Sequence, residues 1–135
     1  MSRTCKIAAK VKISGITYNV VSIGKGAFKN NKKITKVLVG KNVKTIGDSA
    51  FAGCKKLKQV SCNYTALKSI GKAAFKEDKK LKKFIIKSKK LKKVAKNSFK
   101  GVKKSCVIKV PKAKKKAYTT LFRKKGLSKK VKIKS

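Results

Sequence analysis

The stretch Val43-Lys-Thr-Ile-Gly-Asp-Ser-Ala-Phe-Ala-Gly-Cys-Lys-Lys-Leu-Lys-Gln-Val60 decides the fold of this chain, because its pattern occurs in four copies. The copies align on four phenylalanines, which are separated by 23, 24 and 24 residues: Phe28, Phe51, Phe75 and Phe99. A constant period of this length is typical of a solenoid, in which each copy forms one turn and stacks on its neighbours.

Other positions of the repeat also keep their chemical character. A small residue stands immediately before each phenylalanine, namely Ala27, Ala50, Ala74 and Ser98. The position four before it is Gly24, Gly47, Gly71 and then Ala95, and the position five before it is Ile23, Ile46, Ile70 and Val94. The position nine after it is Val37, Val60, Phe84 and Ile108. The fourth copy departs at the position six after phenylalanine, where Ser105 replaces an aliphatic residue.

Each copy combines a strand signal with a turn signal. Toward its end, the segment from Leu57 to Cys62 alternates in the period of a strand with one buried face. The Gly-x-x-Ala-Phe segment suits a tight, partly helical turn, because glycine and alanine let backbones approach closely. Stacking then joins the apolar positions into internal ladders, with strands about 4.8 Å apart. We therefore expect an α/β, β-rich solenoid of four turns, each 23–24 residues long.

The composition is strongly basic. Among 135 residues there are 42 Lys and Arg but 3 Asp and Glu, which gives a formal net charge of +39. Such charge opposes collapse, so the composition alone permits a basic disordered tail as well as a small folded domain coated with lysine. The repeat favours the folded domain. No apolar run is long enough to span a membrane, and the first residues lack the apolar segment of a secretory signal.

Catalytic and metal chemistry have little support in the sequence. Histidine is absent, and three acidic residues cannot form a carboxylate cluster for magnesium or calcium. The acids Asp48, Glu77 and Asp78 are interpreted as turn residues that offset neighbouring lysines, or as residues without a role. The cysteines have no CxxC spacing, so we interpret them as small buried hydrophobes, although a zinc site is possible in principle: Cys5, Cys54, Cys62 and Cys106. We expect no enzyme activity, no cofactor and no metal.

The quoted stretch resembles the BspA-like leucine-rich repeat of bacterial cell-surface proteins, whose pattern is V-x-x-I-G-x-x-A-F-x-x-C followed by L-x-x-I-x-I. The resemblance covers residues 20–111, and the segment after Val110 resembles the closing segment of such proteins. Cys54 holds the cysteine of the pattern, whereas the other copies have Asn31, Asp78 and Val102. The resemblance implies a curved, right-handed leucine-rich-repeat solenoid from a secreted or surface-anchored protein involved in adhesion. It brings no catalytic residues.

The two ends of the stack require covers, because a solenoid otherwise exposes its core. Residues 1–19 are predicted to form an N-terminal β-hairpin cap, since alternating runs flank a two-residue Ser-Gly loop. Residues 20–111 hold the four repeats, and residues 112–135 are predicted to form a C-terminal helix cap and a short strand within the same structural domain. The apolar stripe of this helix either covers the final turn or binds a partner: Ala113, Ala117, Tyr118, Leu121 and Phe122.

The repeat also orders the lysines. The fourth and fifth positions after every phenylalanine are lysine, and these are the candidate polyanion-binding residues: Lys32, Lys33, Lys55, Lys56, Lys79, Lys80, Lys103 and Lys104. Outward strand positions form a candidate strand-face binding surface: Lys36, Leu38, Gln59, Ser61, Lys83, Ile85 and Lys109, with Leu38 and Ile85 expected to be exposed. Lysine columns can serve solubility alone, but the scarcity of acids favours attraction to anions.

These observations lead to two functional hypotheses. The first is a non-catalytic cell-surface interaction or adhesion module, a monomer that binds a host or cell-surface protein, or an anionic glycan or wall polymer. The second is binding of nucleic acid or other polyanions without sequence specificity. Lysine far outnumbers arginine and most phenylalanines are core positions, so sequence-specific nucleic-acid recognition is not expected. The family resemblance implies an extracellular or cell-surface location.

Overall fold

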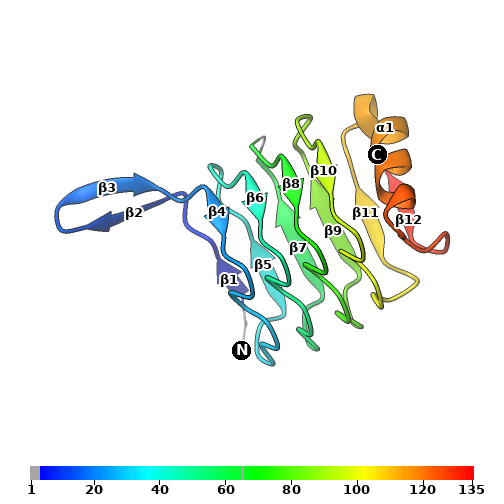
Figure 1. The fold of residues 1–135 in the computed structure, drawn as a ribbon, viewed down its shortest axis with the longest axis horizontal. Coiled ribbons are helices and arrows are strands. Elements are labelled where there is room, and N and C mark those ends of the chain that lie inside the picture. The colour runs from blue at the N-terminus through cyan, green and yellow to red at the C-terminus, as the bar shows by residue number, and fades with distance from the viewer. Residues whose placement is uncertain (1–3, 65) are drawn as a thin grey trace.

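The computed structural model describes residues 4–64 and 66–135, and in that part of the chain two parallel sheets form a stack (Figure 1). The larger sheet has six strands, ordered β1 (Thr4–Lys6), β5 (Lys36–Leu38), β7 (Gln59–Cys62), β9 (Lys83–Ile86), β11 (Val107–Lys109) and β12 (Lys132–Lys134). The smaller sheet has four short strands, ordered β10 (Lys93–Val94), β8 (Ser69–Ile70), β6 (Thr45–Ile46) and β4 (Ser22–Ile23). Equivalent positions of successive copies therefore lie side by side.

The register of the larger sheet matches the repeat read from the sequence. Val37 pairs with Val60, Val60 with Phe84, and Phe84 with Ile108. All four of these residues are fully buried. The predicted strand ladder, with one face toward the core, is confirmed.

The four phenylalanines form a stacked column through the core. Ring centroids are 5.1 Å apart between Phe28 and Phe51, 5.4 Å between Phe51 and Phe75, and 5.2 Å between Phe75 and Phe99. Phe84 packs edge-on against both Phe75 and Phe99, at 4.9 and 5.1 Å. These distances are close to the spacing of neighbouring strands, so the aromatic column and the sheets share one repeat distance.

Each turn around phenylalanine uses two left-handed residues. They lie two positions before and two after phenylalanine, with φ between 54° and 83°: Gly26, Asn30, Ser49, Gly53, Ala73, Glu77, Asn97 and Gly101. In the turn of Phe51, the N–H groups of three alternate residues, Ser49 to Gly53, donate to carbonyls of the next copy at 2.8–2.9 Å. The turns of Phe28 and Phe75 make the same three bonds. These bonds hold the side chains of successive turns in register.

In the fourth copy, the turn that follows the phenylalanine turn is closed by a hydrogen bond one residue later than in the third copy. In the third copy the N–H of Leu81 donates to the carbonyl of Asp78 at 3.1 Å, and in the fourth copy the N–H of Cys106 donates to that of Lys103 at 2.9 Å. Cys106 is consequently buried and Ser105 is exposed. The register of β11 is unchanged. The sequence break at Ser105 is therefore absorbed within the loop.

The N-terminal hairpin does not cover the first turn. Strands β2 (Lys10–Ile13) and β3 (Ile16–Asn19) pair antiparallel, as predicted, but they project from the stack and contact no other described strand or helix (Figure 1). It is β1 that pairs with the edge of β5. On the other half of the first turn, Ala27 is exposed and Phe28 is half-buried. The predicted hairpin cap is wrong in its placement, because alternation and turn residues determine strand pairing but not the direction in which a hairpin points.

The C-terminal segment lies on the fourth turn. A short 3-10 turn, η1 (Lys112–Lys114), leads into α1 (Lys115–Lys124). The ring of Phe122 packs on Phe99 at a centroid distance of 5.5 Å, so α1 continues the aromatic column. The chain then reverses at Gly126, whose φ is 93°, and pairs with β11 through β12.

A buried hydroxyl attaches α1 to the loop before β10. The hydroxyl of Tyr118 accepts the N–H of Leu91 at 3.1 Å and donates to the carbonyl of Ser88 at 2.7 Å. Ala113 and Ala117, which the sequence places on the apolar stripe, are exposed instead. Of the two alternatives for this helix, contact with the final turn is the one observed.

Candidate ligand-binding surface

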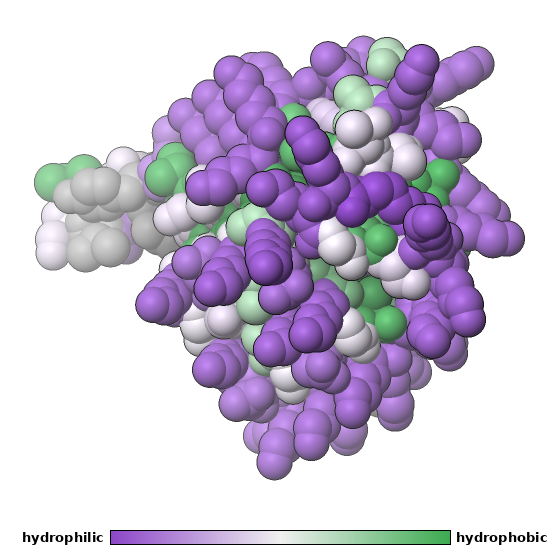
Figure 2. Space-filling model, turned by 45° about the vertical axis from the view of Figure 1, so that its right-hand side comes forward, coloured by the Kyte–Doolittle hydropathy of each residue, from purple (hydrophilic) through white to green (hydrophobic). Residues whose placement is uncertain are grey.

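The eight candidate lysines lie in the loops between the phenylalanine turns and the strands of the larger sheet, and all eight are exposed. Because the turns are held in register, the lysines of the first three copies follow the repeat distance of the phenylalanine rings, 5.1 to 5.4 Å. In the fourth copy the delayed turn puts Lys104, rather than Lys103, in the place of Lys79. Figure 2 shows hydrophilic side chains over most of the visible face, with apolar atoms between them.

Three shorter lysine columns flank these loops. They stand seven before, three before and one after phenylalanine: Lys44, Lys68, Lys92; Lys25, Lys72, Lys96; and Lys29, Lys76, Lys100. All are exposed except the half-buried Lys76. Two unit charges 5 Å apart in water repel by about 0.8 kcal/mol, so each column stores repulsion that a bound anion relieves.

Acidic groups neutralise very little of this charge. Glu77 Oε2 lies 3.9 Å from Lys79 Nζ, and among the described residues this is the only ion pair. The carboxylate of Asp48 accepts the backbone N–H of Lys72 at 2.8 Å. Asp48 thus binds the backbone of the next turn, at a position where the other copies carry lysine.

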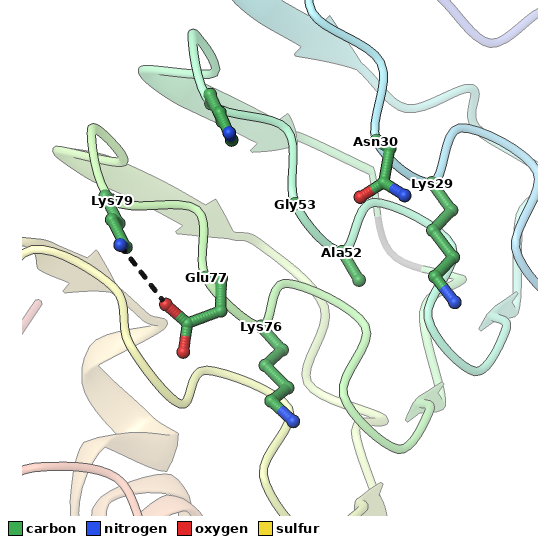
Figure 3. Close-up of a pocket in the computed structure, with 8 residues that line it drawn as sticks. Lys29, Asn30, Ala52, Gly53, Lys76, Glu77 and Lys79 are labelled. Atoms are coloured by element: carbon green, nitrogen blue, oxygen red, sulfur yellow. Dashed lines mark ion pairs between the residues drawn. The ribbon is translucent and has the colours of Figure 1, made fainter.

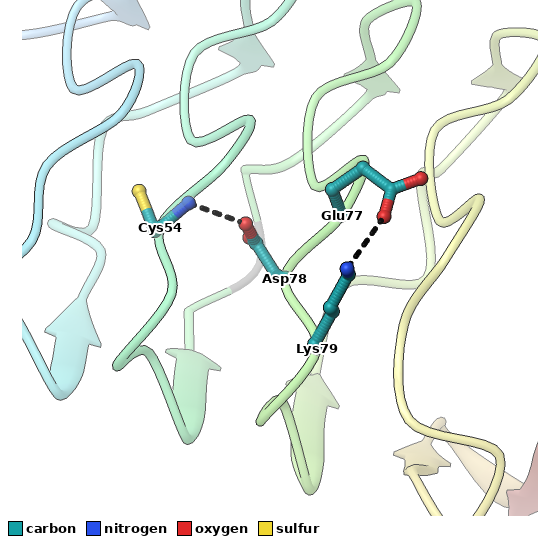
Figure 4. A network of polar contacts seen from close by, with 4 residues as sticks. All are labelled: Cys54, Glu77, Asp78 and Lys79. Atoms are coloured by element: carbon teal, nitrogen blue, oxygen red, sulfur yellow. Dashed lines mark hydrogen bonds and ion pairs between the residues drawn. The ribbon is translucent and has the colours of Figure 1, made fainter.

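The third acid, Asp78, is fully buried (Figure 4). Its Oδ1 accepts the N–H of Cys54 from the preceding turn at 2.8 Å, while its Oδ2 has no hydrogen-bond partner in the described part of the chain. Burial raises the pKa of Asp78 to about 9, against a smaller opposite effect of the Cys54 N–H. The carboxyl is therefore protonated at neutral pH, and the expectation that Asp78 offsets a neighbouring lysine is wrong.

The strand face is more closed than the sequence suggested. Lys36, Gln59 and Lys83 are aligned by the sheet register and half-buried, and Lys109 is exposed. Leu38 and Ile85 are half-buried rather than exposed. Ser61 lies between these two residues, receives a hydrogen bond from the Gln59 amide at 3.1 Å and is only 3% exposed, so it is unsuited to ligand contact. Among the side chains that the structure describes, the exposed large apolar ones are instead Ile16, Val21 and Tyr64.

A cavity of about 360 Å³ opens beside the lysine columns of the second and third copies (Figure 3). It is lined by Lys29, Asn30, Ala52, Gly53, Lys55, Lys76, Glu77 and Lys79. Figure 3 shows Lys29 and Lys76 extending in the same direction, with Ala52 between them. The sequence analysis did not identify this cavity, although the signal was present: Ala52 is the one residue that interrupts the lysine column directly after phenylalanine.

The cysteines are free thiols in the core. Cys54, Cys62 and Cys106 are buried, and Cys5 is half-buried. Burial raises the pKa of the Cys62 and Cys106 thiols to about 12, which keeps them protonated and weakly reactive. Within the described ranges no group of cysteine or acidic side chains is placed to hold a metal ion.

The stacked parallel sheets, the repeated aromatic turn and the lysine-lined edge define a repeat solenoid that offers an extended surface for binding. Residues 8–135 match the family model of the BspA type leucine-rich repeat region, with six copies. The chain therefore belongs to the BspA-type leucine-rich repeat family. The family model counts two copies more than the four full turns expected from the sequence.

Solved structures agree with this assignment. A leucine-rich repeat protein from Bacteroides capillosus is 30% identical, with a TM-score of 0.70 over 82% of this chain and 78% of that one. One from Bacteroides ovatus is 27% identical, with a TM-score of 0.67 over 82% of this chain and 30% of that one. A leucine-rich cell surface protein from Faecalibacterium prausnitzii shares the fold, at 22% identity and a TM-score of 0.55, over 81% of this chain and 38% of that one. No curated protein matches the chain.

The described residues contain no helix with the length and apolar character needed to cross a bilayer.

Proposed function

We propose that this chain is a non-catalytic interaction module that binds anionic polymers through its lysine columns. The observation that carries the proposal is the exposure of all eight loop lysines along one edge of the stack, with a single ion pair among the described residues. A polyanion lying along this edge relieves the repulsion between neighbouring lysines and releases its own counterions. Membership in a family of repeat scaffolds supports a binding role over a catalytic one.

The proposed setting is extracellular or at the cell surface. The family and a structural relative described as a cell surface protein support this setting. The ligands that it offers are host or cell-surface proteins, anionic glycans and wall polymers. In this proposal the partly exposed strand face, from Lys36 to Lys109, contacts protein partners, and the lysine columns hold the anionic polymer.

Nucleic acid is the alternative polyanion. Sequence-blind binding to single strands usually combines basic grooves with exposed aromatic rings on which bases stack. Among the side chains that the structure describes, Tyr64 is the exposed aromatic ring, and it lies in a separate cavity with Lys6 and Lys41. Because this single ring lies apart from the eight loop lysines, it offers no series of stacking sites along the proposed edge, which favours a polymer without bases.

Heparin chromatography tests the proposal. We expect the protein to elute well above physiological ionic strength, about 0.15 M. Substituting Lys55, Lys56, Lys79 and Lys80 with Gln should shift elution to lower salt than substituting four exposed lysines of the C-terminal segment, Lys112, Lys116, Lys129 and Lys130, although both variants lose the same charge. Elution of the wild type below physiological salt, or equal shifts in the two variants, contradicts the proposal. Stronger retention on single-stranded DNA than on heparin favours the alternative.

A further inference from the structure

We propose that the cavity above Ala52 and Gly53 holds one sulfated or carboxylated sugar unit of a longer anionic polysaccharide. This inference rests on the proposed function, because it names the unit that the lysine columns bind. In this cavity, lysine side chains, the methyl group of Ala52 and the amide of Asn30 lie together at the lysine-lined edge (Figure 3).

The cavity exists because one lysine is missing from a column. The position after phenylalanine is lysine in the first, third and fourth copies, and the short side chain of Ala52 leaves the space between Lys29 and Lys76 open. The next residue, Gly53, has a φ of 69°, and the side-chain oxygen of Asn30 lies where a Cβ of Gly53 would stand. Ala52 and the Asn30 amide over Gly53 thus form a floor between Lys29 and Lys76, which lie two turns apart.

The rim supplies positive charge from three successive copies. Lys29, Lys55 and Lys76 form no ion pair with any described residue, so their ammonium groups are free to contact a ligand. Lys79 is paired with Glu77 at 3.9 Å, and its ammonium group remains largely exposed. An anionic group bound here meets lysines of two different columns, from the first, second and third turns together.

The size and lining favour a sugar ring over a bare anion. Small-molecule sites usually measure roughly 300–1,000 Å³, so this cavity of about 360 Å³ accommodates a single ring-sized group. Ala52 lines the cavity and is 8% exposed, so its methyl group offers a small apolar contact for the C–H face of a sugar. The side-chain amide of Asn30 lines the cavity with its oxygen packed against Gly53, and its NH2 group can donate a hydrogen bond to a ring hydroxyl.

The lining also disfavours the other polyanions. No aromatic side chain lines the cavity, so a nucleobase finds no ring on which to stack. The carboxylate of Glu77 stands at the rim and repels the closely spaced charges of a polyphosphate, whereas a sugar hydroxyl can donate a hydrogen bond to it. An anionic polysaccharide, in which charged groups alternate with hydroxyls, fits both features.

The substitution Ala52→Lys tests the cavity against simple charge. It completes the lysine column, so the backbone of three other copies shows that lysine is compatible with this position. It also adds a positive charge, and simple attraction predicts tighter binding. The proposed sugar site predicts weaker binding, because the new lysine side chain fills the cavity. Thr120→Lys is the matched control, since it adds the same charge at an exposed position of α1, outside the proposed binding surfaces.

The measurement is calorimetric titration with a fully sulfated heparin tetrasaccharide at physiological salt. We expect Ala52→Lys to weaken binding by about tenfold, equivalent to about 1.4 kcal/mol, and Thr120→Lys to leave it unchanged or slightly tighter. Amide resonances of Ala52 and Gly53 should shift on saturation with the tetrasaccharide. If Ala52→Lys binds the tetrasaccharide equally well or more tightly, the cavity does not hold the sugar and this inference is wrong. The proposed function is tested separately, by the retention of the wild type on heparin.

Competition identifies the ligand class. Tripolyphosphate and a short single-stranded DNA, each at the same total charge as the tetrasaccharide, should displace it poorly from the wild type. Equal displacement by tripolyphosphate means that the site selects charge alone and overturns the assignment to a sugar. Stronger displacement by DNA overturns it in favour of nucleic acid.

Discussion

The position three residues after phenylalanine shows how one column of the repeat carries different chemistry. The side-chain oxygen of Asn31 accepts two N–H groups of its own turn, at 2.9 and 3.1 Å. Cys54 donates its S–H to the carbonyl of Phe28 at 3.2 Å, and Asp78 accepts the N–H of Cys54 (Figure 4). The column therefore ties three turns together. Asp78 is the costly member, because its second oxygen is buried without a partner in the described chain.

We predict that Asp78→Asn stabilises the protein at neutral pH. Burial raises the pKa of Asp78 from an unfolded value near 4 to about 9, so the folded state retains a proton that the unfolded state releases. The stability from this group is therefore complete below pH 4 and is lost as the pH rises toward 9. Between pH 5 and 8 this linkage removes about 4 kcal/mol of stability, so the melting temperature of the wild type should fall by roughly 10–20 °C, while that of the variant stays nearly constant.

Asp48→Asn is the control for this measurement, because it changes an exposed carboxylate that also accepts a backbone N–H. The chain has no histidine, so few other side chains change charge in this range. A wild type whose stability is independent of pH, or a similar response of the two variants, contradicts the assignment of a buried protonated carboxyl.

The glycine four residues before phenylalanine packs tightly on the preceding turn in the second and third copies, whereas the fourth copy has Ala95 at this position. A Cβ on Gly71 would lie 2.5 Å from the backbone nitrogen of Asp48, whereas a Cβ on Gly24 would meet nothing within 4 Å. We predict that Gly71→Ala costs about 1–3 kcal/mol and that Gly24→Ala changes stability by less than about 0.5 kcal/mol, both measured by urea denaturation. Equal costs at the two positions contradict this explanation of the glycine column.

Residue roles were predictable where they follow from the period alone. The alignment of the four copies is sufficient to predict that Phe51 and Phe84 are buried. The burial of Ser61 could not be predicted, because it depends on the half-buried Leu38 and Ile85 of the adjacent strands closing over a small side chain. The cavity above Ala52 required knowing that successive turns lie close enough for one missing side chain to leave a hollow.

At the scale of elements, the two ends of the stack differ. At the C-terminal end, α1 extends the aromatic column, and the carbonyl of Lys125, directly after α1, accepts the N–H of Asn97 at 3.4 Å. At the N-terminal end, the carbonyls of Lys25, Ala27 and Lys29 are equivalent to carbonyls that accept N–H groups of the preceding turn in later copies. No described residue donates a hydrogen bond to these three carbonyls. One end is closed by a helix, and half of the other is open.

We predict that Tyr118→Phe destabilises the protein by about 1–3 kcal/mol, because the N–H of Leu91 loses its buried acceptor while the ring remains in place. Thermal or chemical denaturation measures the loss. Thr120→Ala is the control: it removes an exposed hydroxyl that bonds only the carbonyl of Lys116 within α1, and it should change stability by less than about 0.5 kcal/mol. A neutral Tyr118→Phe shows that the hydroxyl does not attach the helix.

The elements themselves were largely predictable, and their placement at the N-terminus was not. Alternating residues around Ser14 and Gly15 predict the hairpin of β2 and β3, which the structure contains. The direction of a hairpin depends on contacts with the stack, and the sequence of β2 and β3 carries no period that would reveal them. The helix α1 differs in this respect, because Tyr118 and Phe122 lie one turn apart on its buried face.

At the scale of the whole molecule, the charge of +39 is a property of the surface. The apolar columns fill the interior, and the lysines occupy the loops and turns left outside, where almost no acid compensates them. We predict that the melting temperature rises by more than about 5 °C between 10 and 300 mM NaCl at pH 7, as the screening length falls from about 30 Å to below 8 Å. A melting temperature that is constant or falls with salt shows that the lysines do not repel one another appreciably.

The measurement that tests the central claim most directly is the salt dependence of binding to fluorescently labelled heparin. The slope of log K against log salt counts the charges neutralised, by roughly 0.7–0.9 per contact. Substitution of Lys55, Lys56, Lys79 and Lys80 with Gln should reduce the magnitude of this slope by about 3, and substitution of Lys112, Lys116, Lys129 and Lys130 by less than about 1. Equal reductions in the two variants would mean that the ordered columns bind no better than any other lysines, and would contradict the claim.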